Sequence, residues 1–141
     1  MLGYSLFKNL SQGKNLRVFG TVRSLKKVEK FYGEEEKRSL FLFDALGDEK
    51  NFTGLLKKIK PNYVINCIGA ISQKDIDTEI MTKLNTCLPH QISKACDLVE
   101  TKLIHFSTDC VFTGSKGNYN ELDIPDASDI YGKSKFLGEV S

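Results

Sequence analysis

Short apolar runs alternate with longer stretches of helical spacing along the 141 residues of this chain. Each run is only a few residues long and rich in Val, Ile, Leu, Phe or Tyr, which is typical of buried strands. Pro61 ends the helical stretch before the third run, because proline cannot continue a helix. The predicted strands are Leu16–Val22, Leu40–Phe43, Tyr63–Ile68 and Lys102–Phe106.

Between these runs, apolar residues recur every three or four positions, as Phe52, Leu55 and Ile59 do, which is the spacing of an amphipathic helix. Strands separated by helices of about ten to twenty residues indicate parallel βαβ units. The prediction is therefore one α/β domain over residues 1–141, with a doubly wound parallel sheet. The predicted helices are Met1–Leu10, Ser24–Tyr32, Asp48–Lys60, Asp77–Val99 with a kink or break at Pro89, and Asp129–Ser141.

The charge pattern excludes some classes of partner. Charged residues make up 27% of the chain, the net charge is +2 and the basic residues are scattered, so no nucleic-acid-binding patch is predicted. No apolar run approaches the roughly 20 residues of a membrane span, and no signal-peptide pattern is present. We therefore expect a cytoplasmic protein with neither a nucleic-acid partner nor a membrane partner.

The cysteines lack the spacing of a metal site. Cys67, Cys87, Cys96 and Cys110 include no Cys-x-x-Cys pair, and no paired histidines accompany them. Disulfides are not expected in a reducing compartment. Because each cysteine has apolar neighbours, we expect all of them to be small buried side chains, and no metal to be bound.

The strongest chemical signal follows the last predicted strand. The chain breaks into a turn-rich loop at Ser107, and Tyr131 and Lys135 then lie four residues apart. If a helix begins at Asp129, this spacing puts the phenol and the ammonium on one face, one turn apart. A free phenol titrates near about 10, and a neighbouring ammonium favours its ionised form, so the pair suits proton transfer at neutral pH. With the Thr108 hydroxyl to hold a carbonyl oxygen, these residues predict carbonyl reduction or alcohol oxidation.

The segments STDCVFTG, ELD and YGKSK appear in this order, and the dipeptide GE follows the lysine. They resemble the extended short-chain dehydrogenase/reductase superfamily and are most similar to the family of dTDP-4-dehydrorhamnose reductases. The resemblance implies a Rossmann-like fold and NADPH-dependent reduction of a nucleotide-linked 4-keto-6-deoxy sugar. It also implies catalytic roles: Thr108 orients the carbonyl oxygen, Tyr131 protonates it, and Lys135 sets the ionisation and hydrogen-bonds the nicotinamide ribose.

The resemblance further indicates that the sequence is an internal fragment of the family pattern. Met1, Leu2 and Gly3 are similar to the end of the glycine-rich turn that meets the cofactor pyrophosphate at a helix N-terminus. The first strand, which lies mid-sheet, and the C-terminal substrate lobe would then be missing, and we expect no turnover from residues 1–141 alone. The alternative is a compact variant in which Leu16–Val22 and Tyr63–Ile68 pair directly.

Ligands of such folds bind beyond the carboxyl ends of the strands. No Asp or Glu follows Leu16–Val22 to bind a ribose 2′-hydroxyl. Arg23 follows it instead, and a guanidinium suits the 2′-phosphate of NADP, so NADP is expected rather than NAD. The alternative is that Arg23 is an exposed arginine at the start of a helix.

Two further strand ends resemble cofactor positions of the family. Asp44 and Ala45 match the place where an aspartate meets the adenine amino group, although an aspartate there also suits a turn. Ile68, Gly69 and Ala70 match the loop that passes under the adenosine ribose and the diphosphate. A glycine in that loop permits close approach of the backbone to a ligand.

Asn85 matches an asparagine near the family's active site that supports the lysine or a water molecule. The alternative is a structural asparagine within a helix. His105 has no partner pattern of a catalytic base, and we expect it to be packed and hydrogen-bonded in the core. The segment Glu121–Asp123 is expected to form a wall toward the substrate.

Two other functions remain open from the sequence. One is NAD-dependent epimerisation or dehydration of a nucleotide sugar, which would use the same three catalytic residues with additional acid–base groups. The other is a non-catalytic NAD(P)-binding regulatory subunit, which the intact triad disfavours. A homodimer through exposed strand edges is also compatible with the chain.

Overall fold

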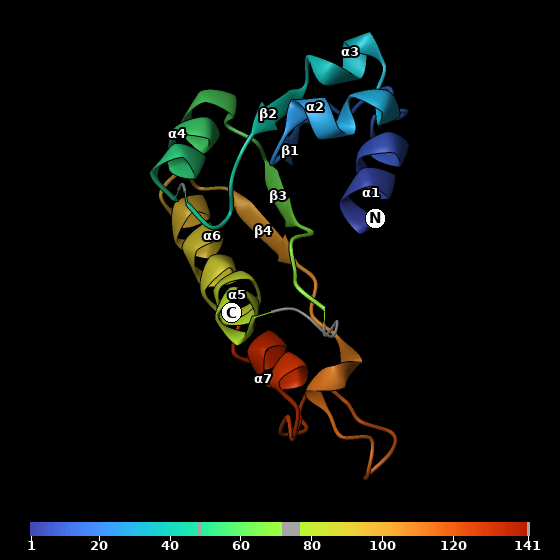
Figure 1. Ribbon diagram of the computed structural model, residues 1–141, viewed down its shortest axis with the longest axis vertical. Coiled ribbons are helices and arrows are strands. Elements are labelled where there is room, and N and C mark those ends of the chain that lie inside the picture. Colours follow the sequence, from blue (N-terminus) through green and yellow to red (C-terminus); the bar gives the residue numbers. More distant parts are fainter. Residues whose placement is uncertain (48, 72–76, 141) are drawn as a thin grey trace. The chain divides into compact units, whose positions relative to one another are not determined.

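The computed structural model describes residues 1–47, 49–71 and 77–140 (Figure 1). The chain divides into two compact units, Met1–Phe52 and Thr53–Ser141, and each is described by itself. The strands form two separate parallel pairs, one in each unit, so the α/β class with parallel strands is confirmed. Direct pairing of Leu16–Val22 with Tyr63–Ile68 is not among the pairings of the described strands.

The first unit is built around a short parallel pair. β1 (Gly20–Val22) lies beside β2 (Leu40–Leu42), with Gly20 opposite Leu40 and Val22 opposite Leu42. α1 (Leu2–Leu10) turns Phe7 into the core, and a Cβ on Gly20 would lie 3.1 Å from the Phe7 ring. Three further helical segments of this unit are α2 (Leu25–Val28), η1 (Glu29–Phe31) and α3 (Glu34–Lys37).

The first unit departs from the sequence prediction in two places. The strand predicted from Leu16 begins only at Gly20, because β2 offers hydrogen-bond partners over just three residues. α3 was not predicted, and its three consecutive glutamates hide any apolar stripe. It is held to α1 by an ion pair of 2.6 Å between Lys8 and Glu36.

The second unit contains the longer parallel pair of strands. β3 (Tyr63–Asn66) lies beside β4 (Lys102–His105), with Asn66 opposite His105. α4 (Glu49–Ile59) precedes β3, beginning in the first unit and ending in the second. The predicted strand to Ile68 ends at Asn66, because the Asn66 side chain accepts a hydrogen bond from the Ile68 amide at 3.0 Å and the backbone turns away.

The helical stretch predicted over Asp77–Val99 continues through Pro89 without a break. α5 (Thr78–Thr82), the π-helical turn η2 (Lys83–Cys87) and α6 (Leu88–Asp97) follow one another directly. Proline at position 89 has no N–H for the carbonyl four residues earlier, and the wider π turn accommodates this, with the Leu88 amide donating to the Lys83 carbonyl.

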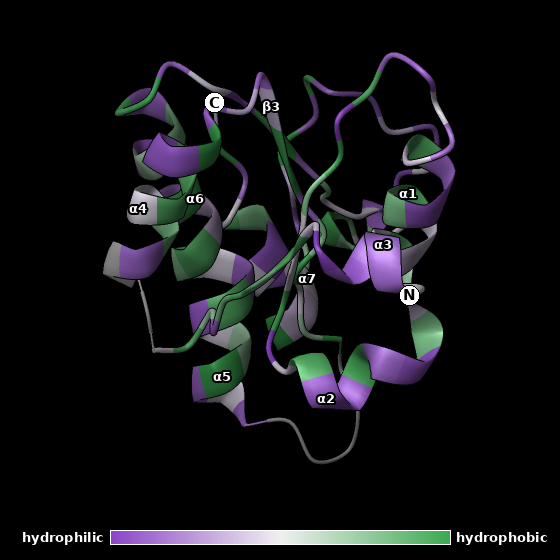
Figure 2. Cartoon of the chain, turned by 90° about the horizontal axis from the view of Figure 1, so that it is seen from above, coloured by the Kyte–Doolittle hydropathy of each residue, from purple (hydrophilic) through white to green (hydrophobic). Residues whose placement is uncertain are grey.

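α6 is amphipathic, and both hydrophobic and hydrophilic stretches are visible on its coil in Figure 2. Leu88, Ile92, Ala95 and Cys96 are its buried residues other than Pro89, at the spacing of one helix face. None of the helices in the described ranges is long and apolar enough to span a bilayer.

The last elements are short and lie beyond β4. η3 (Asp109–Val111) follows the strand, and α7 (Ile130–Phe136) follows a long loop. Asp129 is the N-cap of α7 and accepts a hydrogen bond from the Gly132 amide at 3.0 Å, as expected for a helix that begins there. α7 ends before the predicted Ser141, which lies outside the described residues.

Candidate functional site

Thr108 lies directly beyond the carboxyl end of β4. Its hydroxyl accepts a hydrogen bond from the Cys110 amide at 3.2 Å and donates to the Asp109 carboxylate at 3.2 Å, so it caps η3. The side chain is half-buried. The prediction that this threonine stands at a strand end is confirmed, while its contact with a carbonyl substrate stays a prediction.

α7 carries Tyr131 and Lys135 one turn apart, as the spacing predicts. Lys135 is only 6% exposed, and its ammonium donates to the Phe106 carbonyl at 2.6 Å. Burial lowers the pKa of Lys135, and the Glu139 carboxylate opposes this by raising it. Among the described residues, the half-buried Tyr131 has no hydrogen-bond partner for its hydroxyl. A buried ammonium thus joins this helix to the strand end that leads to Thr108.

Close backbone contact fixes α7 against the turn that follows Thr108. A Cβ added to Gly132 would lie 2.2 Å from the Cys110 carbonyl oxygen and 2.6 Å from the Ala127 Cβ. No real Cβ approaches backbone so closely, so only glycine fits in this position. The glycine of the YGKSK segment is therefore explained by packing.

Asn85 is fully buried in the π-helical turn and bridges two segments (0% exposed). Its Oδ1 accepts from the Ala70 amide at 2.7 Å, and its Nδ2 donates to the Ala70 carbonyl at 2.9 Å. Nδ2 also donates to the Ser134 hydroxyl on α7 at 3.1 Å. The asparagine and the Ile68–Ala70 loop, both singled out from the sequence, thus lie together. Ser134 was missed, although its position three residues after Tyr131 places it on the buried side of the helix.

His105 on β4 faces Asn66 across the parallel pair, and the two side chains form a hydrogen bond of 3.1 Å through the His105 Nδ1. The His105 Nε2 is buried and has no partner among the described residues. Burial lowers the pKa of His105, the Lys135 ammonium lowers it further, and Glu139 opposes them. The expected hydrogen bond of His105 is confirmed, while its side chain is half-buried and not fully packed in a core.

The lowered pKa of His105 predicts a pH effect on stability. Free histidine titrates near about 6.5, and the folded chain holds this group below that value, so the unfolded state binds more protons as the pH falls. The contribution of His105 to the free energy of unfolding is complete above about 6.5 and is lost as the pH falls from that value through the lower pKa of the folded state. We expect the melting temperature to fall between pH 7.5 and pH 5, and His105→Gln to reduce the fall. The melting temperatures are measured by thermal denaturation. An equal fall for the wild type and for His105→Gln would contradict this prediction.

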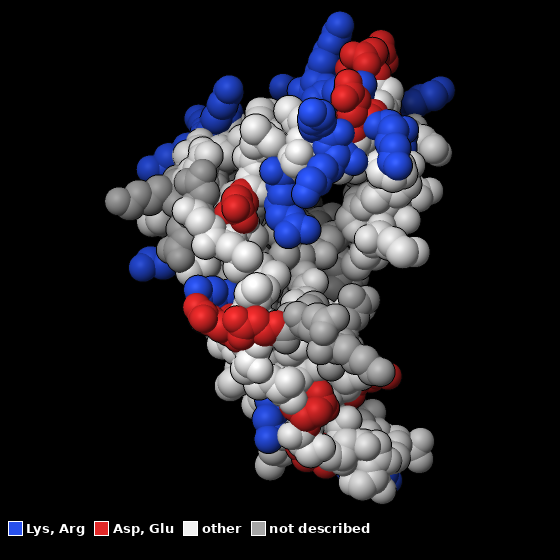
Figure 3. Space-filling model, in the orientation of Figure 1, with Lys and Arg blue, Asp and Glu red and all other residues white. Residues whose placement is uncertain are grey.

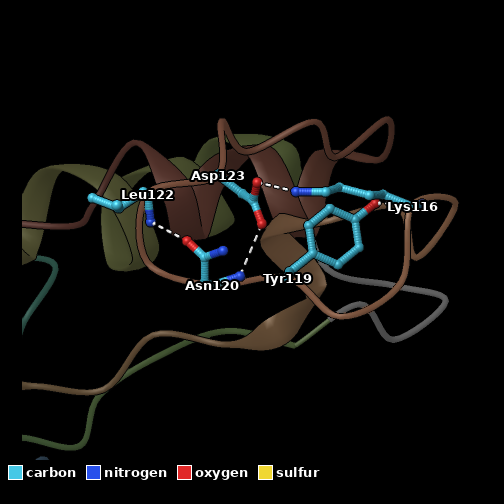
Figure 4. A network of polar contacts seen from close by, with 5 residues as sticks. All are labelled: Lys116, Tyr119, Asn120, Leu122 and Asp123. Atoms are coloured by element: carbon cyan, nitrogen blue, oxygen red, sulfur yellow. Dashed lines mark hydrogen bonds and ion pairs between the residues drawn. The ribbon is translucent and has the colours of Figure 1, made fainter.

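The loop between η3 and α7 has a defined structure (Figure 4). Lys116 forms an ion pair with Asp123, whose other oxygen accepts from the Asn120 amide at 2.9 Å. The Leu122 amide donates to the Asn120 side-chain oxygen at 2.9 Å. The Leu122 side chain itself is 94% exposed. The Glu121–Asp123 segment is therefore held in a fixed turn, and its role as a wall toward the substrate stays a prediction.

In the first unit, the predicted cofactor residues follow the strand ends. Arg23 comes directly after β1 and is exposed. Asp44 follows β2 after Phe43, and its carboxylate accepts a hydrogen bond from the Leu46 amide at 3.1 Å. This contact fits the alternative given above, an aspartate that stabilises a turn. Ala45, the next residue, is half-buried.

Met1 is the N-cap of α1, and Leu2 and Gly3 open its first turn. These residues therefore lie at a helix N-terminus, the kind of place where backbone amides meet a pyrophosphate in dinucleotide folds. Contact of Met1, Leu2 or Gly3 with a cofactor stays a prediction.

The cysteines are only partly as expected. Cys96 is buried, and burial raises its pKa to about 11. Cys67 is only half-buried, and Cys87 and Cys110 are exposed, so the prediction that all four are buried holds in full only for Cys96. Apolar neighbours in sequence do not decide which face of a helix or turn meets solvent. Within the described ranges, no group of three or more His, Cys, Asp or Glu could hold a metal ion.

The whole chain, residues 1–141, matches the family described as the RmlD substrate binding domain. A probable low-salt glycan biosynthesis reductase of Haloferax volcanii is 36% identical over 95 residues, which are 65% of this chain and 32% of that protein. The dTDP-4-dehydrorhamnose reductase of Shigella flexneri is 31% identical over 102 residues, or 68% of this chain and 34% of that protein. The methionine adenosyltransferase 2 subunit beta of Danio rerio is 29% identical over 107 residues, which are 76% of this chain and 33% of that protein.

The chain spans about a third of the length of these relatives. Among solved structures, a hypothetical dTDP-4-dehydrorhamnose reductase from Sulfolobus tokodaii has a TM-score of 0.76 and 30% identity, over 97% of this chain and 46% of that chain. The dTDP-4-dehydrorhamnose reductase of Bacillus anthracis, solved in complex with NADP, has a TM-score of 0.63 and 23% identity, over 89% and 49%. At this identity the second likeness concerns the fold alone, and the expected Rossmann-like class is confirmed.

Proposed function

Because this chain belongs to the RmlD substrate binding domain family, we propose that it supplies the catalytic residues and part of the cofactor site of a cytoplasmic NADP-dependent reductase. The substrate is a nucleotide-linked 4-keto-6-deoxy sugar, of the class named in the reductase relatives. One observation carries the proposal. The ammonium of Lys135, one turn beyond Tyr131, is buried against the carbonyl of Phe106, two residues before Thr108.

Tyr131, Lys135 and Thr108 have separate roles in the proposed reaction. Bound NADPH supplies a hydride to the carbonyl carbon of the sugar. Tyr131 gives its proton to the carbonyl oxygen as that oxygen becomes an alcohol, and solvent restores the proton afterwards. The positive charge of Lys135, one turn away on the same helix, stabilises the negative charge that develops on the phenol oxygen as the proton leaves, and the hydroxyl of Thr108 donates a hydrogen bond that orients the carbonyl oxygen.

The cofactor preference rests on Arg23 at the carboxyl end of β1. Lys and Arg side chains lie over the first unit in Figure 3, beside a group of acidic side chains. Among the described residues of that unit, Asp44 is the one acidic side chain just beyond a strand. A guanidinium binds a phosphate through charge-assisted hydrogen bonds worth about 1.5–3 kcal/mol. NAD bound at the carboxyl end of β1 would find Arg23 there and no carboxylate to pair with its ribose 2′-hydroxyl.

The test compares two lengths of protein and two nicotinamide cofactors. Since the relatives are about three times as long, the complete reading frame that contains these residues is assayed beside residues 1–141 alone. We expect the longer protein to oxidise NADPH in the presence of a dTDP-4-keto-6-deoxy sugar, with NADH a poorer substitute, and the short chain to show no turnover. Arg23→Ser should weaken NADPH binding by roughly tenfold or more and leave NADH binding unchanged.

The matched control is Arg38→Ser, an exposed arginine at the end of α3. NADPH binding should survive this exchange. If the longer protein binds neither cofactor, or if NADPH oxidation does not depend on a keto sugar, the reductase proposal is wrong.

A non-catalytic nucleotide-binding subunit is the second candidate, because one relative is named as the beta subunit of methionine adenosyltransferase 2. That function predicts cofactor binding without NADPH oxidation by any 4-keto sugar. The intact Thr108, Tyr131 and Lys135 favour the reductase, and the same assay separates the two functions.

A further inference from the structure

A continuous line of hydrogen bonds joins the Ile68–Ala70 loop to the helix that carries Tyr131. The Asn85 amide pairs with both backbone groups of Ala70, at 2.7 and 2.9 Å. Its Nδ2 continues to the Ser134 hydroxyl at 3.1 Å, and this hydroxyl donates to the Tyr131 carbonyl at 2.8 Å. The line therefore ends on the backbone of the proposed proton donor.

Ala70, Asn85 and Ser134, which form this line, are all buried. Asn85 is 0% exposed, Ser134 is 2% exposed and Ala70 is 6% exposed. Both amide protons of Asn85 are used, its oxygen accepts a hydrogen bond, and the Ser134 hydroxyl both accepts and donates. A buried network whose members are all paired holds a single geometry, because any rearrangement leaves a polar atom unpaired in a medium of low dielectric constant.

α7 is also attached to the π-helical turn and α6 by contacts that do not involve the Ser134 hydroxyl. The Thr86 hydroxyl donates to the Ser134 carbonyl at 2.8 Å, and His90 bonds the Leu137 carbonyl at 2.8 Å. These two contacts hold the last turn of the helix. Removing the Ser134 hydroxyl therefore leaves α7 attached and interrupts only its connection with the loop.

We propose that Ser134 is a positioning residue that couples the Gly69–Ala70 loop to Tyr131, so that a nicotinamide cofactor bound on the loop fixes the place of the proton donor. This proposal rests on the proposed function, since it takes the loop as part of the cofactor site. Space at Gly69 agrees with it, because a Cβ there would be in ordinary contact with Asn85, 3.4 Å from Oδ1. Gly69 is exposed and its surroundings leave room for a side chain, so a glycine here is suited to close approach of a ligand to the backbone.

The first test measures turnover in the complete reading frame with Ser134→Ala. We expect kcat to fall by about tenfold to a hundredfold, because a small displacement of a reacting group costs this much, while the KM for NADPH changes by less than about twofold. Rates are measured far below the melting temperature and divided by the concentration of NADPH-binding sites, so that loss of folded protein does not count. Ser134→Cys, which keeps a weak donor and acceptor, should recover part of kcat.

The matched control is Ser128→Ala, the same exchange at an exposed serine before α7. It should change neither constant. If Ser134→Ala lowers the melting temperature but leaves kcat per binding site at the wild-type value, Ser134 has only a structural role and the coupling is refuted.

The second test does not depend on turnover. NADPH is added to the wild-type protein and to Ser134→Ala, and amide hydrogen exchange is followed in peptides that cover residues 66–71 and 130–137. In the wild type, we expect NADPH to slow exchange in both peptides, and in the variant only in residues 66–71. Protection of both peptides in the variant, or no protection of residues 130–137 in the wild type, refutes the coupling while leaving the reductase proposal intact. A wild type that binds no NADPH refutes the proposed function and the coupling with it.

Discussion

Tyr131→Phe is expected to bind NADPH as the unchanged protein does and to lose nearly all turnover of a 4-keto sugar. The exchange removes one hydroxyl and keeps the ring, and within the described part of the chain that hydroxyl makes no hydrogen bond that folding would lose. A positioned proton donor contributes about a hundredfold to ten-thousandfold in rate, so kcat should fall by an amount in this range. The measurement is NADPH oxidation in the complete reading frame, together with NADPH binding by fluorescence.

The control for this variant is Tyr63→Phe, an identical exchange at an exposed tyrosine that opens β3. It should leave kcat unchanged. Turnover by Tyr131→Phe within about tenfold of the wild type would show that another group donates the proton, since positioned acid catalysis is worth more than that.

Gly138→Ala is expected to have the largest effect on folding. A Cβ at Gly138 would lie 1.8 Å from the Asn85 carbonyl oxygen and 2.9 Å from its carbonyl carbon. Both are backbone atoms of a buried turn, so they cannot move aside as the end of a flexible side chain does. Overpacking of a core typically costs about 1–3 kcal/mol, and contact with fixed backbone places this variant at or above the upper end of that range.

The fall in the free energy of unfolding is measured by urea denaturation. The control is Gly54→Ala in the middle of α4, where no atom lies within 4 Å of the added Cβ. Replacing a helical glycine by alanine there should raise stability by up to about 1 kcal/mol. If Gly138→Ala and Gly54→Ala change the free energy of unfolding in the same direction, the close approach of Gly138 to Asn85 does not constrain the fold.

Gly138 also shows how Pro89 and the GE dipeptide are related. The proline removes the amide that would bond the Asn85 carbonyl in a regular α-helix, and the π turn results. Gly138 approaches that same carbonyl, and the Gly138 amide itself donates to Lys135 within its own helix end. Gly138 lies 49 positions after Pro89 in the sequence, so local spacing gave no indication that Gly138 contacts the Asn85 carbonyl.

The order of strands and helices was predictable because it depends on local patterns of apolar residues. Strand and helix periodicity placed β2, β3, β4, α1 and α4 within a few residues of their observed bounds. Helix α3 was missed because consecutive glutamates mask any periodicity, and the strand from Leu16 was too long because pairing, which sets its length, is not visible in one sequence.

The sequence by itself determined where the proposed catalytic residues lie on their elements: Thr108 beyond a strand, and Tyr131 and Lys135 four residues apart on one helix, because spacing along a regular element fixes which side chains share a face. The tertiary structure decided how those groups are held. It joined Lys135 to the Phe106 carbonyl, and it joined Ser134 and Asn85 to the Ile68–Ala70 loop. Such contacts link residues 15 to 49 positions apart, and they arise only when buried polar groups must find partners as the helices close over the strands.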